Sequence, residues 1–397
     1  MSIIMSLNSG SSSCKAQLYQ MPEEKVLCSA LFERIGQSVG NITFELENAK
    51  HTDEVLLPNH KVAIEILLKL LVEHGVISSL DDISGIGHRI VHGGEKYKHS
   101  ALFTAEVEAD IEALIDLAPL HNPANLLGYR VMKELLPNVT QVAVFDTAFH
   151  QSMEPVSFMY PIPIEYYQKY RIRKYGFHGT SHLYVTSRAR SILGEDQSRR
   201  LICCHLGNGG SLSAVKDGEC VNTSMGFTPL AGIMMGTRSG DIDPSIMAYL
   251  AEKEELSAVK ITDICNKKSG ILGISQVSSD MRDIEEAINQ GNKQAELARA
   301  MYVQRVGMTI GSYIAQLGGC DAILFTAGIG ENSSIVRKLI IDSITDAFGV
   351  TLDDKKNSLR KQEIEISSVD SKIKVFVIPT NEELVIAQDT YQLYSVN

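Results

Sequence analysis

The chain has 397 residues, 44% of them hydrophobic and 21% charged, a composition typical of a soluble globular protein with room for two domains. Its net charge of −11 disfavours nucleic acid and acidic membranes as partners, so local Arg, Lys and His side chains would have to hold an anionic substrate. Its seven cysteines form no CxxC pair, it shows no secretory leader, and no uncharged run is long enough to cross a membrane, so we expect reduced thiols and a cytoplasmic location.

One local pattern, an apolar run followed by a loop of small residues, occurs twice. Residues 2–7 lead into Asn8–Ser13, and residues 201–206 lead into Gly207–Ser211. Each loop is followed by a second apolar run and a turn, which predicts a strand–loop–strand hairpin. Each could be an ordinary tight hairpin, but amides in such loops also suit phosphate oxygens. Because the hairpins begin the two halves of the chain, we expect a duplicated domain with one phosphate-binding hairpin in each half.

Helices and strands are predicted to alternate through the rest of the chain. In the first half, the expected helices span 59–74, 104–117 and 124–136, and the expected strands span 85–91 and 141–145. The elements expected in the second half are a helix capped by Thr180 or Ser181 and ending at Gly194, a helix starting at Asp243–Pro244, helices over 283–316 with a break near Gly291, a strand at 322–326, a helix at 333–348, a strand at 373–378, and a final helix with a capping box of Thr380 and Glu383.

Polar residues follow the carboxyl ends of several expected strands. They are Asp146, His205–Gly210, Gly328–Asn332 and Asn381–Glu382. In an α/β sheet, ligands bind at the carboxyl ends of the strands. We therefore expect these residues to line one cleft.

Eight motifs distributed over nearly the whole chain have a combined specificity that none has alone. In order they are NSGSSSCK at 8–15, GHRIVHGG at 87–94, FDTAFH at 145–150, YGFHGTSH at 175–182, HLGNG at 205–209, MGTRSGD at 235–241, GIGEN at 328–332 and TNEEL at 380–384. In these motifs the chain resembles the acetate kinase family of carboxylate kinases, which belongs to the superfamily of actin-like ATPases and sugar kinases. The resemblance implies an α/β fold of two duplicated actin-like ATPase (ribonuclease H-like) domains with a cleft between them. The implied domains are 1–150 with the C-terminal helix 384–397, and 151–383.

The resemblance also implies a reaction, the reversible Mg²⁺-dependent transfer of the ATP γ-phosphoryl group to acetate, giving acetyl phosphate and ADP. Mn²⁺ is the alternative metal, and the implied assembly is a homodimer. Such a transfer depends mainly on positioning and on neutralising charge. By resemblance, Arg89 and Arg238 stabilise the transition state and orient acetate, and His178 donates to the same charge. The alternative for each arginine is a surface ion pair, and for His178 it is simple packing at a helix start.

Asp146 is the family's proposed proton donor or acceptor, but acetate is already ionised at pH 7, since a carboxyl pKa is about 4. We predict instead that Asp146 acts through Mg²⁺ or its waters, or holds an arginine. By resemblance, Asn8 and Glu382 hold the metal, whose preferred ligands are oxygens. The alternative for Glu382 is a carboxylate that favours the first turn of a helix.

The nucleotide and acyl sites are also assigned by resemblance. Lys15 is a predicted phosphate contact, with a strand-edge lysine as the alternative. The further nucleotide-binding residues are His205, Leu206, Gly207, Asn208 and Gly209 at the phosphates, Gly328, Ile329, Gly330, Glu331 and Asn332 near the adenosine, and Asp280, Met281 and Arg282 near the ribose or base, the last three being otherwise a polar turn before a helix. The acetate methyl group is expected to meet Val91, Leu120, Phe177 and Pro229, for which the alternative is core packing.

Three residues depart from the family pattern: Cys14 replaces an aliphatic residue, Ser9 a Cys or Ala, and Ala231 a Glu. The last change removes a charge near the Arg238 loop. Two other functions remain open. One is a propionate kinase of the same family, against which Val91 argues because propionate-preferring relatives often carry a smaller residue there. The other is a non-catalytic actin-like nucleotide switch, which would not need both arginines and His178 together.

Overall fold

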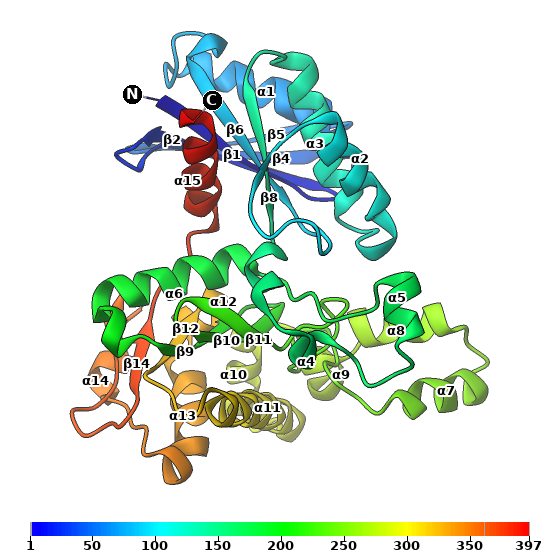
Figure 1. Cartoon of the computed structure of the whole chain (residues 1–397), viewed down its shortest axis with the longest axis vertical. Coiled ribbons are helices and arrows are strands. Elements are labelled where there is room, and N and C mark those ends of the chain that lie inside the picture. The colour runs from blue at the N-terminus through cyan, green and yellow to red at the C-terminus, as the bar shows by residue number, and fades with distance from the viewer. Residues whose placement is uncertain (1, 361, 397) are drawn as a thin grey trace. The chain divides into compact units, whose positions relative to one another are not determined.

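The computed structural model describes residues 2–360 and 362–396. The chain divides into two compact units, Met1–Gln151 with Asn381–Asn397 and Ser152–Thr380, each built on one mixed β-sheet with helices packed against it (Figure 1). Met1 and Asn397, which the expected domain boundaries include, lie outside the described residues. Both sheets are open and combine parallel and antiparallel strands, so the predicted α/β class is confirmed.

The sheet of the first unit has eight strands in the order β5-β4-β3-β2-β1-β6-β8-β7. The five strands β1 to β5 form an antiparallel meander, whereas β1, β6 and β8 run parallel. Because parallel strands end at the same edge of a sheet, the residues at the carboxyl ends of β1, β6 and β8 emerge together. The strands are β1 Ser2–Ser9, β2 Ser13–Met21, β3 Lys25–Glu33, β4 Gly40–Leu46, β5 Ala49–Val55, β6 Ile83–Ile90, β7 Ala101–Leu102 and β8 Thr140–Phe145.

The second sheet repeats part of the first. Its order is β11-β10-β9-β12-β14-β13, and β11-β10-β9-β12-β14 shows the same directions as β3-β2-β1-β6-β8: two antiparallel pairs followed by two parallel pairs. The predicted duplication is therefore confirmed at the level of strand topology. The strands are β9 Arg200–Leu206, β10 Gly210–Lys216, β11 Glu219–Thr223, β12 Ala322–Thr326, β13 Ile364–Glu365 and β14 Lys374–Val377.

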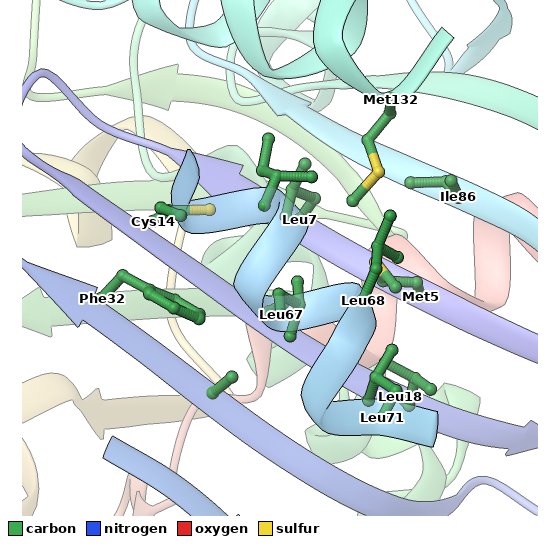
Figure 2. Close-up of a cluster of buried hydrophobic side chains, with 14 of the residues drawn as sticks. Met5, Leu7, Cys14, Leu18, Phe32, Leu67, Leu68, Leu71, Ile86 and Met132 are labelled. Carbon is green, nitrogen blue, oxygen red and sulfur yellow. The ribbon is translucent and has the colours of Figure 1, made fainter. Parts of the chain in front are cut away.

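Helix α1 (His60–Glu73) covers the meander of the first unit and forms its main core. Asn59 caps this helix, because its Oδ1 accepts from the amide of Val62 at 3.0 Å. Leu67 of α1 belongs to the same buried cluster as Met5 and Phe32 of the strands, and all three side chains are fully buried (Figure 2). The other helices of this unit are α2 Ala105–Ala113, α3 Asn122–Leu135, α15 Glu382–Ser395 and the short 3₁₀ turns at Leu80–Asp82, Ile115–Leu117 and Ala148–Ser152.

Helix α15 packs on the other face of the sheet, against β6, β1 and β8. Val142 and Val144 of β8 contact its Ile386, whereas the alternate residues of β8 face α2 and α3. The approach of α15 to β6 requires a glycine, because a Cβ at Gly87 would overlap Ile386 and Thr390. Side chains of residues two apart on a strand lie on the same face of the sheet, so Arg89 also points toward the face that α15 covers.

The helices of the second unit agree broadly with the sequence pattern. The predicted break near Gly291 separates α10 from α11, and Asp243 caps α7 as expected, accepting from the amide of Ser245 at 2.8 Å. The helices are α4 Pro155–Phe158, α5 Glu165–Tyr170, α6 Gly179–Leu193, α7 Pro244–Lys253, α8 Ala258–Lys267, α9 Gly270–Ser275, α10 Met281–Asn289, α11 Lys293–Leu317, α12 Ala327–Asn332, α13 Ser334–Phe348 and α14 Asp354–Asn357, with a 3₁₀ turn at Glu195–Gln197. No helix within the described residues is both long and apolar enough to traverse a bilayer.

Two predicted helix caps are wrong. Helix α6 is preceded by His178, which is in the left-handed region with φ 58°, and neither Thr180 nor Ser181 caps it. Helix α15 is capped by Asn381, whose Oδ1 accepts from the amide of Leu384 at 3.1 Å, and not by Thr380. In both cases a hydroxyl predicted to cap is engaged elsewhere: Oγ1 of Thr380 donates to Oγ of Ser181 at 2.7 Å.

Candidate active site

In the first unit, Arg89 and Asp146 form a two-pronged ion pair at the ends of the neighbouring strands β6 and β8. Nε of Arg89 donates to Oδ1 at 3.0 Å and Nη2 donates to Oδ2 at 2.6 Å. The Asp146 side chain is only 2% exposed and that of Arg89 23%. Burial lowers the pKa of Arg89, but the charge and hydrogen bonds of Asp146 outweigh this and raise it. Asp146 thus holds an arginine, one of the two predicted roles, and a surface ion pair does not describe a pair with a buried carboxylate.

The first turn of α15 brings further charges toward this pair. The pKa of Glu382 lies above the ordinary carboxyl value because burial raises it, although the positive charges of Arg89 and Lys15 partly offset this. Asp146 and Glu383 act in the same direction as burial. Lys15 of β2 forms an ion pair with Glu383. The sheet edge of the first unit therefore gathers two cations and three carboxylates.

The predicted metal ligands Asn8 and Glu382 both belong to the first unit. Asn8 lies at the carboxyl end of β1, and both side chains are half-buried. Within the described residues, no three His, Cys, Asp or Glu side chains are placed to hold a metal by themselves. The oxygen atoms of Asn8 and Glu382 are of the kind that Mg²⁺ binds, usually one or two protein carboxylates together with water and phosphate oxygens.

Two side chains donate hydrogen bonds to main-chain carbonyls of the first small-residue loop, Asn8–Ser13. Nε2 of His60 donates to the carbonyl of Gly10 at 2.7 Å, and Nδ2 of Asn125 donates to the carbonyl of Ser9 at 2.8 Å. In a trans peptide the carbonyl and the following N–H point in opposite directions. The N–H of Ser11 is therefore turned away from His60, and Ser11 and Ser12 are exposed. This geometry fits a loop that presents amides to an anion.

The predicted acyl-pocket residues differ in burial. Leu120 is 70% exposed in the loop before α3, which excludes the core-packing alternative for it. Val91 is 6% exposed and Phe177 3% exposed, so core packing remains possible for both of them. Val91 and Leu120 belong to the first unit, and Phe177 and Pro229 to the second.

In the second unit, three histidines form a connected polar cluster. The rings of His178 and His205 stack with centroids 4.1 Å apart. The hydroxyl of Ser211 lies 2.9 Å from Nδ1 of His178 and 2.8 Å from Nε2 of His182, and the hydroxyl of Ser181 lies 2.8 Å from Nδ1 of His205. His182 and His205 are buried, whereas His178 is half-buried. The hydroxyls of Ser211 and Ser181 therefore help to fix the orientation of the His178 ring, which we expect to contact substrate. The sequence analysis did not predict this role for either serine.

Arg238 lies beside this cluster without a carboxylate partner. Its Nη1 donates to the carbonyl of Pro229 at 3.3 Å, and within the described part of the chain it forms no ion pair. Burial lowers its pKa. A Cβ at Gly209 would lie 3.2 Å from Arg238 Nη1 and 3.7 Å from His178 Cε1, so the glycine, the arginine and the histidine converge. The surface-ion-pair alternative is excluded for Arg238, and the site has a cation that an anionic ligand would stabilise.

The loop after β9 is tight and carries the predicted phosphate contacts. The amide of Gly207 donates to the carbonyl of Gly209 at 3.1 Å, and the amide of Gly236 donates to the carbonyl of Asn208 at 3.0 Å. Leu206 is fully buried, so only its main chain is suited to a phosphate contact. The second contact ties this loop to the loop that carries Arg238.

The predicted adenosine contacts 328–332 lie within α12, at the carboxyl end of β12. Oε1 of Glu331 accepts from the amides of Ala327 at 2.8 Å and Thr380 at 3.2 Å, and Nδ2 of Asn332 donates to the carbonyl of Gly328 at 2.9 Å. Gly328 is exposed, Gly330 is buried and Ile329 is half-buried. These side-chain contacts stabilise the turn itself, so its exposed main chain is what remains available to a nucleotide.

Asp280 caps α10, and its carboxylate pairs with Arg282, whose side chain is 88% exposed. Met281 between them is 3% exposed. The polar turn before a helix that the sequence offered as an alternative describes these three residues fully, and their contact with a ribose or base stays a prediction.

Sequence reasoning also missed Arg337, a fully buried arginine with no carboxylate partner among the described residues. Its Nη1 donates to the carbonyls of Gly330 at 2.9 Å and Glu331 at 3.0 Å, and its Nε donates to Oδ1 of Asn357 at 2.8 Å. Burial, its largest influence, lowers the pKa of Arg337 to about 10. The signal was available, because residue 337 falls on the apolar face of the helix predicted at 333–348.

Comparison with known proteins gives consistent matches over the whole chain. Residues 3–388 match the sequence model of the Acetokinase family. The acetate kinase of Geobacillus sp. (strain WCH70) is 52% identical over 397 residues, which cover 100% of both chains. The crystal structure of Porphyromonas gingivalis acetate kinase has a TM-score of 0.94 and 44% identity, covering 99% of this chain and 100% of that one. A propionate kinase from Francisella tularensis has a TM-score of 0.93 and 43% identity, with coverage of 99% and 100%.

Proposed function

Because this chain belongs to the acetokinase family of two-domain carboxylate kinases, which use ATP and a divalent metal, we propose that it phosphorylates acetate, reversibly forming acetyl phosphate and ADP. The observation that carries this proposal is the pair of arginines. The fork of Arg89 is fixed by Asp146, and Arg238 is half-buried without a carboxylate partner among the described residues. A nucleotide switch has no need of these cations, whereas a phosphoryl group in transfer needs both charge and orientation.

We propose that Arg89, Arg238 and His178 act on one phosphoryl group. The transition state spreads negative charge over three equatorial oxygens, which planar guanidinium groups match in geometry. His178 stacks on His205 and is bound by Ser211, so its ring keeps one orientation without reorganising during the reaction. Acetate supplies the attacking oxygen already ionised, so Asp146 serves by fixing Arg89 and removes no proton.

We propose Mg²⁺ as the metal, with Mn²⁺ as the alternative, held by Asn8 and Glu382. The chemistry of the donors fits: both side chains offer oxygen, and Glu382 has a raised pKa because its charge is buried, a cost that a cation would remove. When bound, the metal would neutralise phosphate charge. Lys15, the loop at 205–209 and the main chain of α12 are the proposed nucleotide contacts, and Asp280, Met281 and Arg282 the weaker ones.

The test is to trap acyl phosphate with hydroxylamine from ATP, Mg²⁺ and acetate. Hydroxamate should form with the parent protein and be lost with Arg238→Met, while ADP binding measured by calorimetry persists. Normal ADP binding by the parent without any hydroxamate would favour the switch.

The similarity to the Francisella propionate kinase makes propionate the second candidate substrate. One methylene in such a pocket changes binding by only about 1–3 kcal/mol, so activity with both acids is expected. The ratio of kcat/KM values for acetate and propionate decides between them. A ratio above one supports acetate, and a ratio below one assigns the protein to propionate.

We also propose a homodimer and a cytoplasmic location. The second unit has a groove of about 690 Å³ between α11 and α13, whose lining combines apolar residues such as Leu339 and Phe348 with the charged residues Glu296 and Arg299. Met308 at its rim is 66% exposed. Apolar surface of this kind is typical of protein interfaces. Light scattering should give the dimer mass for the parent and the monomer mass for Met308→Glu, and a monomeric parent would refute the assembly.

A further inference from the structure

One buried amide joins the two strand ends that carry the proposed metal and phosphoryl contacts. The parallel pairing of β1 with β6 ends at Leu7 and His88. Beyond this point, Oδ1 of Asn125 accepts from the amide of Val91 at 3.0 Å, and its Nδ2 donates to the carbonyl of Ser9 at 2.8 Å. A primary amide offers the same donor and acceptor as a peptide unit. Asn125 therefore extends the ladder where the two main chains separate.

The orientation of this amide is fixed by its partners. An N–H must be met by an acceptor and a carbonyl by a donor, so the reversed amide would lose both hydrogen bonds. Asn125 is 3% exposed, and water cannot readily replace it. Removing the amide would leave the amide of Val91 and the carbonyl of Ser9 unpaired in a buried setting.

Helix α3, which carries Asn125, is itself held firmly against the end of β1. A Cβ at Gly128 would lie 2.9 Å from Cβ of Ser9, so the helix could not approach as it does with any larger residue there. Further along, Met132 is fully buried in the core that α1 forms with the strands (Figure 2). The amide is thus mounted on a helix that has little freedom to shift.

The two hydrogen bonds of Asn125, here called the tie, connect segments whose residues have different predicted roles. Ser9 directly follows Asn8, the proposed metal ligand, and Val91 comes two residues after Arg89, the proposed phosphoryl contact. Val91 is also one of the proposed walls of the acyl pocket. The spacing of the two strand ends therefore sets the spacing of the metal side and the acyl side of the site.

We propose that Asn125 is a positioning residue for phosphoryl transfer, holding Asn8 and Arg89 at their working separation and fixing Val91 against the acyl group. This inference rests on the proposed function. It concerns the first unit only, because all four residues lie there. It predicts an effect on the acyl substrate and on turnover that differs from a general loss of stability.

Two variants separate the parts of the tie. Asn125→Leu removes both hydrogen bonds at similar volume, and Asn125→Asp keeps the acceptor for Val91 but sets a carboxylate oxygen against the carbonyl of Ser9. For both, kcat/KM for acetate should fall about 10- to 100-fold, as small displacements of positioned groups do. The ratio of kcat/KM for acetate and propionate should change. The affinity for ADP should stay within about twofold, because its proposed contacts other than Lys15 lie in the second unit.

Lowering the pH should restore activity to the Asn125→Asp variant. A protonated carboxyl can donate to Ser9 and still accept from Val91, and burial raises a carboxyl pKa. The activity of Asn125→Asp relative to the parent should therefore recover as the pH falls below neutrality, whereas that of Asn125→Leu should not. If Asn125→Leu does not fold, the aspartate variant alone decides.

Met132→Ala is the matched control, because it weakens the same helix about two turns away and keeps the amide. It should lower the unfolding temperature but leave the acetate-to-propionate ratio unchanged. Parental kinetics in the Asn125 variants, or an equal change of the ratio in Met132→Ala, would overturn the inference. A parent protein that forms no hydroxamate would instead refute the proposed function, so the two failures are distinguishable.

Discussion

The role of Asp146 can be tested by replacing it with asparagine. In the structure its carboxylate receives hydrogen bonds at 3.0 and 2.6 Å from Arg89, and it is 2% exposed. An asparagine of the same shape keeps one acceptor for Arg89, but its amino group faces the guanidinium and the charge is lost. The orientation of Arg89 should suffer while the backbone stays in place.

The size of the effect follows from the geometry. Two unit charges about 3 Å apart attract by roughly 5 kcal/mol at an effective dielectric constant of about 20, and burying the carboxylate costs several kcal/mol against this. Removing one partner leaves the Arg89 charge partly buried and without its hydrogen-bonded counterion, with only the charges of Glu382 and Glu383 nearby, so the free energy of unfolding should fall by about 2–4 kcal/mol. Because the freed arginine no longer points at the phosphoryl group, kcat/KM should fall about 100- to 1,000-fold.

A double-variant cycle decides whether Asp146 acts only through Arg89. If it does, the variant that combines Asp146→Asn with Arg89→Met should lose no more activity than Arg89→Met alone, and no limb of the pH profile should vanish. If the activity losses of the two single variants multiply in the double variant, or if Asp146→Asn loses one limb of the pH–activity profile, Asp146 transfers a proton and our assignment is refuted. Glu108→Gln is the control: its pair with Arg130 is at the surface, so stability should change by less than about 1 kcal/mol and activity not at all.

Three further outcomes are expected. The pKa of Glu382 is raised in the folded state, so its ionisation lowers the free energy of unfolding as the pH rises above the ordinary carboxyl pKa. Without metal, Glu382→Gln should therefore have an unfolding temperature at neutral pH no lower than that of the parent. It should also lose the increase in unfolding temperature that Mg²⁺ gives the parent. A lower unfolding temperature without metal would contradict this. Ser211→Ala removes the hydroxyl contact to Nδ1 of His178, so kcat should fall with KM for ATP little changed. An unchanged kcat in steady-state assays would exclude the orienting role. Arg337→Met leaves the carbonyls of Gly330 and Glu331 unpaired, so urea titration should show a loss of about 3 kcal/mol and calorimetry a weaker ADP complex, whereas parental ADP affinity would separate Arg337 from the nucleotide site.

The features that the sequence predicted well are local. The apolar runs before Asn8 and Gly207 form central strands, and the small residues after them form the turns of two hairpins. The helix at 59–74 was predicted from its apolar face, and α1 at His60–Glu73 matches it. In each case, residues close in sequence supply the signal.

Strands β3 to β5 were not predicted, and the reason is visible in β5. None of its residues Ala49–Val55 is buried, so it carries no hydrophobic alternation to detect. It exists because every residue from Gly40 to Leu46 pairs with it across the hairpin. The site residues were likewise beyond local reasoning: the fork between Arg89 and Asp146 joins residues 57 positions apart, and only the parallel pairing of β6 with β8 makes them neighbours.

The two wrong helix caps have a common origin, which leads back to the histidine cluster. Ser181 and Thr380 each have the sequence context of a helix cap, yet the hydroxyl of Thr380 donates to that of Ser181, which in turn lies 2.8 Å from Nδ1 of His205. The contacts that these two hydroxyls make are to each other and to His205 and not to a helix amide, whereas Asn381 caps α15 and His178 precedes α6 in the left-handed region. Strain of that kind persists only where surrounding contacts enforce it. The failure of two strong local rules at one cluster therefore marks the place where the fold orients the ring that stacks on His205.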